Sequence, residues 1–244
     1  MESTTPPADT RNKWIRRAIV LGLMAVPLGL FLLMTNSKQQ FRKLPVFYQD
    51  SLAANGDSLP IVIPPFRFLN QEGRIITEAN LKGRIHVADF FFTECPGICP
   101  RLTQGFVQLQ KDLKDFPTVV LVSYSIDAKR DSVAALRQYA KKYQIDAKRW
   151  YLLTGEEQAL FNHSKLGYKL PAYRDVNSPE DGIVHSNFYV LVDPDLRIRG
   201  FYDCIHPNEN LAKQEYKRLL DEIKVLQHEY REQLQPLNTG NNPS

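Results

Sequence analysis

Apolar and polar positions follow two different periods along the chain, and each change of period predicts where a strand or a helix lies. Residues 85–92 and 118–126 are mostly apolar without polar alternation, which is typical of strands buried on both faces of a sheet. From Pro100 onward, leucine and phenylalanine recur at spacings of four, three and four, which predicts an amphipathic helix. A second helix is expected over residues 131–143, where an Asp-Ser pair provides a cap signal.

Shorter elements flank these segments on both sides. The pattern predicts a hairpin around residues 70–73, a strand over 149–153, a helix over 155–167, two strands within 186–203 joined at 193–195, and a closing helix over 209–230. Strands that alternate with helices, followed by a terminal hairpin and a last helix, predict an α/β sandwich with a mixed central sheet. A cysteine pair at the end of the first central strand points to a thioredoxin-like fold.

The N-terminal region contains a long uncharged stretch. Residues 18–37 carry no charged side chain, and as a helix they would cover about 30 Å, the thickness of a bilayer's hydrocarbon core. A cleaved signal peptide is the competing interpretation, but the apolar run is long for one and no small-x-small cleavage site follows it. We therefore expect one transmembrane helix. The basic cluster before it favours a cytoplasmic N-terminus, although Lys38, Arg42 and Lys43 on the far side reduce the asymmetry.

This topology divides the chain into five parts. We expect a short cytoplasmic tail (1–17), the transmembrane anchor (18–37), a tether (38–60), the folded domain (61–235) and a disordered tail (236–244). The folded domain would lie on the extracytoplasmic, periplasmic side of the inner membrane, which the chain crosses once.

Composition and charge add little about partners. The chain has 244 residues, of which 43% are hydrophobic and 24% charged, as in an ordinary globular protein of one domain or a small pair. The formal net charge of +4 is spread along the sequence without a sustained basic block. Because no nucleic-acid motif accompanies it, we do not expect a nucleic-acid partner.

Cysteine usage indicates a site rather than a disulfide scaffold. The chain has only three cysteines, of which Cys95 and Cys99 lie four positions apart in TECPGICPR, whereas Cys204 is distant. The close pair follows the predicted strand at 85–92 and precedes the predicted helix. An outward-facing domain would meet an oxidising compartment, in which a thiol pair can close into a disulfide.

The spacing of Cys95 and Cys99 allows several chemistries. Residues four apart on a helix share a face about one turn apart, so that both sulfurs can meet one ion. A helix N-terminus also favours thiolate over thiol. Thiolates are soft ligands that suit Cu(I) and zinc rather than magnesium or calcium. A structural disulfide, a pair of buried small residues and metal-free redox exchange remain open alternatives.

A third ligand would have to come from the five histidines. We expect His86, His163 and His228 to be structural or to face the solvent. His206, in DCIHP, belongs either to a second small soft site with Cys204 or to a turn without a special role. His185 follows a glycine-containing loop and opens the predicted strand 187–193. Because loops at strand ends gather at one edge of an α/β sandwich, His185 is within reach of the cysteines as a candidate third ligand, and the alternative is an ordinary histidine before a strand.

The motif around the cysteines resembles a known family. FFFTECPGICPRLTQ is similar to the C-x-x-x-C-P motif of the Sco/SenC family, and SIDAKRDSVAALRQYAKKY, WYLLTG and HSNFYVLVDPDLRIRGFYD resemble the family's later segments in the same order. The resemblance covers residues 60–230, after an N-terminal anchor of the kind common in the family. It implies a thioredoxin-like, copper-handling protein that helps to assemble the binuclear CuA centre of cytochrome c oxidase.

The same resemblance implies a ligand set. Both motif cysteines and the family's histidine correspond to Cys95, Cys99 and His185, which would hold copper as Cu(I) or Cu(II). The implied recipient is cytochrome c oxidase subunit II. The sequence departs from the family at three positions, none of which removes a ligand: Ala128 replaces a usual proline, Val184 stands where many members carry aspartate, and Cys204 lies at a turn often made by glycine.

The function predicted from the sequence is that of a membrane-anchored copper chaperone, which delivers copper to an oxidase subunit or keeps that subunit's thiols reduced. The alternative is a metal-independent extracytoplasmic thiol-disulfide oxidoreductase, an enzyme whose Cys95 and Cys99 form a redox-active catalytic pair. A copper-responsive sensor is a third hypothesis, and it requires a signalling partner that the sequence does not show.

Overall fold

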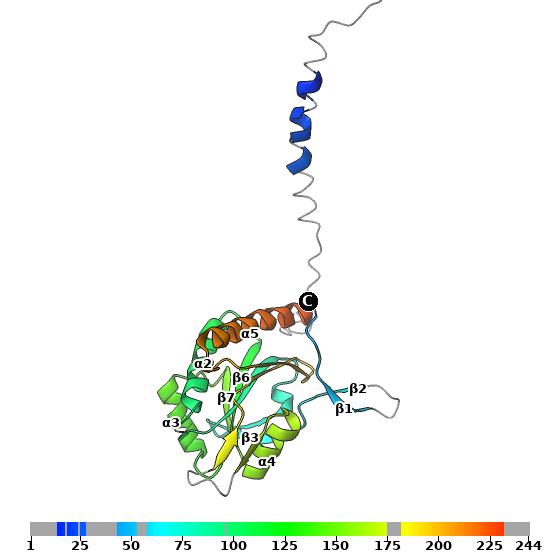
Figure 1. Cartoon of the computed structure of the whole chain (residues 1–244). Coiled ribbons are helices and arrows are strands. Elements are labelled where there is room, and N and C mark those ends of the chain that lie inside the picture. Colours follow the sequence, from blue (N-terminus) through cyan, green and yellow to red (C-terminus); the bar gives the residue numbers. More distant parts are fainter. Residues whose placement is uncertain are drawn as a thin grey trace, which may run out of the picture. The chain divides into compact units, whose positions relative to one another are not determined.

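The computed structural model of the chain describes residues 14–17, 19–23, 25–27, 43–52, 58–95, 97–174 and 182–231. The chain divides into two compact units, residues 1–42 and 43–244, and the described residues of the first are helical (Figure 1). Within the described residues, we find no helix that combines the length and apolar character needed to cross a membrane. Most of the anchor predicted at 18–37 and all of the tail predicted at 236–244 lie outside the described residues.

The second unit is built on a mixed sheet of seven strands, in the order β11-β10-β5-β6-β7-β3-β4. The strands are β3 (Arg67–Asn70), β4 (Ile75–Thr77), β5 (Ile85–Phe91), β6 (Val119–Ser125), β7 (Trp150–Thr154), β10 (Tyr189–Val192) and β11 (Ile198–Tyr202). The central strands β5, β6 and β7 are parallel, whereas β10 and β3 run antiparallel to their central neighbours. Every residue of β5 and β6 is buried, as their mostly apolar sequences without polar alternation predict.

Helices cover both faces of this sheet (Figure 1). The helices of this unit are η1 (Glu78–Asn80), α2 (Cys99–Asp112), α3 (Val133–Tyr143), α4 (Glu157–Asn162), the π-helix η2 (His163–Gly167) and α5 (Glu209–Glu229). On one face, Phe106 of α2 packs on Trp150 at 5.4 Å between ring centroids. Tyr216 of α5 donates to Asp112 at the end of α2. On the opposite face, His163 of η2 packs on Tyr124 at 4.8 Å. The α/β sandwich with a mixed sheet is confirmed.

Two small ribbons were not expected from the sequence. β1 (Tyr48–Leu52) pairs with β2 (Ser58–Pro60) inside the segment predicted as a tether, and β8 (Ala172–Arg174) pairs with β9 (Ile183–His185). The prediction that His185 opens the strand 187–193 is wrong, because His185 ends β9 and residues 186–188 separate it from β10. The three-residue strands β2, β8 and β9 are too short to produce a detectable period in the sequence.

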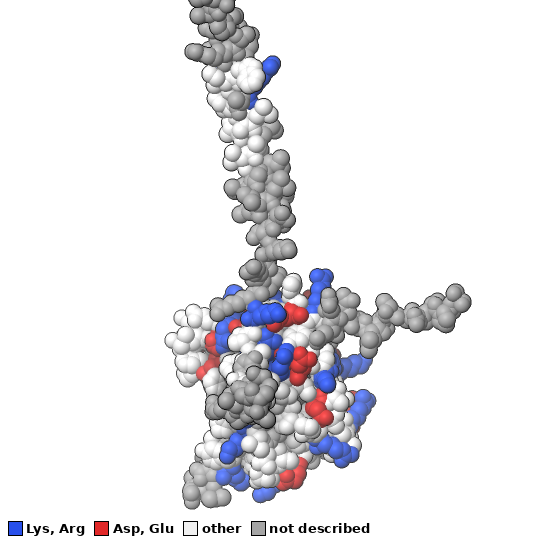
Figure 2. Space-filling model, turned by 90° about the vertical axis from the view of Figure 1, so that its right-hand side faces the viewer, with Lys and Arg blue, Asp and Glu red and all other residues white. Residues whose placement is uncertain are grey.

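Charged side chains of both signs are interspersed on the face of the molecule shown in Figure 2. Along α5 several of them pair one helical turn apart, such as Lys213 with Glu209 at 3.7 Å and Arg218 with Glu222 at 3.4 Å. Pairs of this kind stabilise a helix only slightly, because both partners remain hydrated.

A buried charge cluster ties the beginning of the second unit to its end. Arg199 on β11 is only 2% exposed, and its guanidinium lies 3.0 Å from Asp193 and 2.9 Å from Glu229 of α5. The same guanidinium donates to the backbone carbonyls of Leu44 at 2.7 Å and Pro45 at 3.0 Å. The first residues of the unit are therefore fixed against β11 and the C-terminal helix.

Two histidines lie in an aromatic cluster on the α4 side of the sheet. His86 Nε2 is 3.1 Å from the Tyr168 hydroxyl, which is 3.0 Å from the Tyr124 hydroxyl. His163 packs on Phe66 at 4.8 Å. Burial lowers the pKa of each imidazole from 6.5 to about 3. The structural role expected for these two histidines is confirmed, and His228 is exposed on α5, as expected for a solvent-facing residue.

These lowered pKa values predict that each of the two histidines makes the folded state less stable in acid, whereas a buried carboxyl with a raised pKa, such as Asp89, acts in the opposite direction. Below pH 6.5 the unfolded chain binds protons at His86 and His163, whereas the folded chain leaves both neutral until about pH 3. The stability that each neutral histidine contributes is therefore lost as the pH falls from 6.5 toward 3, by about 2 kcal/mol per histidine between pH 7.5 and 5. Urea unfolding at both pH values measures the loss.

The variant His163→Phe should reduce that pH-dependent loss, whereas His228→Ala, at an exposed position, should leave it unchanged. An equal loss of stability in the wild type and His163→Phe would show that His163 is not kept neutral in the folded chain.

Candidate metal centre

The two motif cysteines lie where the central strand β5 leads into α2. Cys99 is the first residue of α2 and is only 1% exposed, and Pro100 follows it in the first turn, where a missing N–H group costs no hydrogen bond. Cys95 lies in the loop before the helix and is partly exposed. The expectation that both cysteines share one helical face is therefore wrong. The loop brings the sulfurs together instead.

Three ligand atoms converge at this position. The sulfurs of Cys95 and Cys99 and an imidazole nitrogen of His185 all lie within 4.8 Å of one another. His185 Nε2 is 3.2 Å from Cys99 Sγ. Among the described residues, this is the group of histidine, cysteine and acidic side chains close enough together to hold an ion. The structure thus brings together the three residues that the sequence indicated, although they come from a loop, a helix and a separate ribbon.

The orientation of His185 leaves the correct nitrogen available. Its Nδ1 lies 2.9 Å from the backbone carbonyl of Ser186. Because a carbonyl only accepts, this contact assigns the proton of the neutral ring to Nδ1, and the Nε2 lone pair faces Cys99. The Phe92 ring packs edge-on against the imidazole, at 5.8 Å between centroids. Such support from a neighbouring acceptor is typical of histidines that bind metals.

The two sulfurs differ in protonation. A hydrogen bond from Cys99 lowers the pKa of the Cys95 thiol to about 4, with smaller contributions from backbone N–H groups, while burial acts in the opposite direction. The same hydrogen bond, burial and the charge of Cys95 raise the pKa of Cys99. At neutral pH the pair therefore consists of a partly exposed thiolate and a buried thiol.

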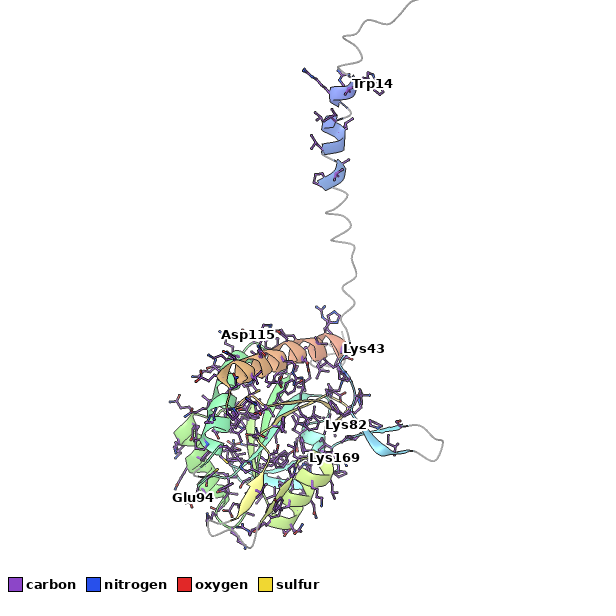
Figure 3. All side chains as sticks on the ribbon, viewed as in Figure 1. Trp14, Lys43, Lys82, Glu94, Asp115 and Lys169 are labelled. Carbon is purple, nitrogen blue, oxygen red and sulfur yellow. The ribbon has the colours of Figure 1, made fainter. Side chains whose placement is uncertain are left out.

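The loop that carries Cys95 is held by a buried carboxylate. Asp131 accepts hydrogen bonds from the backbone N–H of Thr93, at 3.0 Å, and from the hydroxyls of Thr93 and Ser125. The next residue, Glu94, points to the surface, where it pairs with Arg130 at 3.9 Å (Figure 3). The segment after β6 therefore fixes the loop two residues before the first cysteine.

One residue near the site was not proposed from the sequence. Asp89 on β5 is buried, and burial raises the pKa of its carboxyl group to about 7, while a hydrogen bond from Ser123 and the charge of His185 act in the opposite direction. One carboxylate oxygen of Asp89 has no hydrogen-bond partner. The sequence could have indicated Asp89, because it is the one acidic residue in the otherwise mostly apolar segment HVADFFF. An acidic side chain is rarely buried unless it is paired or has a functional role.

Cys204 and His206 lie outside the group of three. Burial raises the pKa of the Cys204 thiol above its ordinary value. His206 accepts a hydrogen bond from the backbone N–H of Asn208 at 3.0 Å, just before α5 begins. His206 thus takes part in the turn that leads into α5.

The donor set fits copper. Two sulfurs and one imidazole nitrogen are soft or intermediate ligands, which bind Cu(I), Cu(II) or zinc and discriminate against magnesium and calcium. Cys99 is buried, whereas Cys95 and His185 are partly exposed, so that an ion held by the three would be reachable from one side. The chemistry of the donors alone does not separate copper from zinc.

Solved structures resemble this fold. BsSco, described as a member of the Sco family of cytochrome c oxidase assembly proteins with a disulfide switch, is 29% identical with a TM-score of 0.58, over 69% of this chain and 94% of that chain. ScoI from Arabidopsis thaliana with copper bound is 26% identical with a TM-score of 0.53, over 66% and 99% of the two chains. The thioredoxin-like fold is confirmed, and copper is the metal found in such relatives.

Comparison with known sequences finds relatives of the same kind as the comparison of structures. A protein of Bacillus subtilis (strain 168), named SCO1 protein homolog, is 33% identical over 153 residues, which make up 61% of this chain and 77% of that protein. The profile of the family described as SCO1/SenC matches residues 55–220. Because that match spans more than half of the chain and includes the strands, the cysteine motif and the histidine described above, the chain belongs to the SCO1/SenC family.

Proposed function

We propose that this protein is a membrane-anchored copper chaperone that serves the assembly of the CuA centre of cytochrome c oxidase. Its ligands would be Cys95, Cys99 and His185, and its recipient subunit II of the oxidase. The observation that carries the proposal is the convergence of these three ligand atoms within 4.8 Å. Membership of a family whose solved relatives include copper-bound proteins and an oxidase assembly protein supports copper as the cargo.

The geometry suits uptake and release. Cys95 already carries a thiolate at neutral pH and is partly exposed, so that it would contact an arriving Cu(I) ion first. Cys99 would then release its proton to solvent as its sulfur binds the ion, and the Nε2 lone pair of His185 would complete a three-ligand site. Three ligands leave the ion open to an incoming thiolate of the recipient, which can bind before a donor ligand leaves.

Copper stoichiometry tests the proposal. The full chain, purified in detergent under reducing conditions, should bind one equivalent of Cu(I), because two soft thiolates satisfy a soft ion. Cys95→Ala should lose this binding. Cys204→Ala is the matched control and should retain it, since Cys204 lies outside the group of three. Loss of copper in the control would mean that the turn at Cys204 belongs to the site and that the ligand set is wrong.

A thiol-disulfide oxidoreductase is the second candidate, favoured by the pKa of about 4 at Cys95 beside a protonated Cys99. A thiolate next to a thiol is the arrangement that attacks a disulfide and then resolves the mixed disulfide. Such an enzyme needs no imidazole ligand. Reduction of a model disulfide at equal rates by the wild type and His185→Ala, without copper binding by either, would favour this function.

We also propose that residues 18–37 anchor the chain in the inner membrane and that residues 61–235 lie on the periplasmic side. The uncharged stretch and the preceding basic residues support this topology. In the view of Figure 3, Lys43 at the start of the folded unit and Glu94 beside Cys95 lie on opposite sides of it. The site would therefore face away from the point where the chain enters the unit.

Reporter fusions test this topology. A periplasm-specific reporter fused after residue 45 should be active and should sediment with the membrane fraction. Activity of a cytoplasm-specific reporter at the same position, or release of the fusion as a shortened soluble protein, would contradict it.

A further inference from the structure

His185 is carried by a ribbon that stands apart from the main sheet. In the described part of the chain, β8 and β9 form a two-stranded sheet of their own. In the register of the ribbon, His185 lies opposite Ala172 and Arg174 lies opposite Ile183. Residues 186–188 connect the ribbon to β10. The position of the imidazole over the cysteines therefore depends on whatever holds the β8 side of the ribbon in place.

Arg174 holds that side through two acidic residues on different elements. Its Nη2 lies 3.2 Å from Oδ1 of Asp127, which follows β6. Its Nε lies 2.9 Å from Oε1 of Glu157, the first residue of α4. Asp127 is only 2% exposed, whereas Arg174 retains 24% exposure. One guanidinium thus joins the ribbon both to the end of a central strand and to a helix.

This contact differs from a surface ion pair because one of its partners, Asp127, is almost fully buried. A carboxylate that is removed from water is weakly screened, so that it attracts a nearby cation more strongly than an exposed carboxylate does. Removing that cation leaves an unpaired buried charge, which destabilises the fold. The planar guanidinium can also serve two acceptors in fixed directions, which a lysine ammonium does not do in the same way. Movement of β8 away from the domain would therefore leave a buried charge with weaker compensation.

The same short segment also holds the other half of the site. Asp127 contacts the ribbon of His185, while Asp131, four residues later, accepts hydrogen bonds from Thr93 beside Cys95. The loop of the first cysteine and the ribbon of the histidine thus both contact the one connection between β6 and α3. A change at the Arg174 contact alters one half of the site and leaves the other half in place.

We propose that Arg174 is a positioning residue for His185, whose ion pairs with Asp127 and Glu157 hold the β8–β9 ribbon so that Nε2 faces Cys99. The inference rests on the proposed copper function, because it assigns Arg174 an effect on the imidazole ligand. It does not make Arg174 a ligand. Removing its charge should displace the imidazole while the two cysteines keep their places.

The test compares Arg174→Met with Arg218→Met in the full chain purified in detergent. Arg218 on α5 also pairs with two glutamates but lies outside the site. Arg174→Met should weaken Cu(II) binding about tenfold, the lower end of the effect expected from losing a ligand's supporting partner. Cu(I) binding, which the cysteines dominate, should change much less. Arg174→Lys, which keeps the charge, should fall between the wild type and Arg174→Met. Arg218→Met should match the wild type.

Two further measurements separate positioning from a general loss of structure. First, Arg174→Met in the His185→Ala background should cause no additional loss of Cu(II) affinity, because its effect passes through His185. Second, the ring signals of His185 in the copper-free protein, observed by NMR, should shift in Arg174→Met and remain unchanged in Arg218→Met. If Arg174→Met folds poorly, Glu157→Gln removes one ionic partner and should shift the same signals by a smaller amount.

Unchanged His185 signals and unchanged Cu(II) affinity in Arg174→Met would overturn the inference, as would an equal loss of affinity in the wild-type and His185→Ala backgrounds. Failure of the proposed function has a different signature. In that case the wild type would bind no copper, and the copper-free NMR comparison would still decide whether Arg174 positions the ring.

Discussion

Replacing His185 by alanine should weaken Cu(II) binding by more than about a hundredfold, because loss of a ligand exceeds the 10–100-fold effect of losing a ligand's supporting partner. Cu(I) binding should fall far less. Two thiolates satisfy a soft ion that accepts low coordination numbers, whereas Cu(II) is harder and is favoured by an imidazole nitrogen in tetragonal surroundings. Replacing Cys95 or Cys99 by alanine should weaken the binding of both oxidation states.

Titration of each variant with each ion measures this asymmetry. The thiolate-to-Cu(II) charge-transfer band reports the oxidised metal, and competition with a Cu(I) chelator reports the reduced one. His206→Ala is the matched control, because His206 lies in a turn and outside the group of three. Equal Cu(II) affinity in the wild type and His185→Ala would remove His185 from the site and leave the metal-free thiol enzyme as the better account.

Replacing Arg199 by methionine should destabilise the folded unit by about 3 kcal/mol, the lower end of the range for breaking a buried ion pair by removing one partner. The change leaves Glu229 without its guanidinium and removes the donors to the carbonyls of Leu44 and Pro45. We expect the lower end of this energy range because Asp193 keeps an ionic partner in Arg197, at 2.9 Å.

Urea unfolding at pH 7 measures this loss of stability. Lys213→Met provides the control, because its pair with Glu209 on α5 is highly exposed and such pairs contribute about 0–1 kcal/mol. A loss below about 1 kcal/mol in Arg199→Met would mean that desolvation of the charges offsets nearly all of their mutual attraction.

The sequence by itself identified the residues of the candidate site but not the geometry that unites them. Cys95 and Cys99 could be selected because two soft donors follow a predicted buried strand, and the resemblance to the Sco/SenC family singled out His185 among the five histidines. The expected cause of the cysteine contact, a shared helical face, was wrong. A spacing of four is compatible with a helical turn and with a loop, and only the packing of that segment on β5 decides between them.

The main elements were predictable because their apolar runs are long and buried, as in β5 and β6. The β8–β9 ribbon was not, since three residues per strand leave no period and the pairing of Ala172 with His185 joins positions far apart in the sequence. The contact of Arg174 with Asp127 could not be predicted either, because these residues are also far apart in the sequence. Side-chain type and local period are properties of short segments, so the sequence determined the strands, helices and donor types. Which segments approach one another depends on the free energy of packing the whole chain, and only the tertiary structure decided that His185 faces the cysteines.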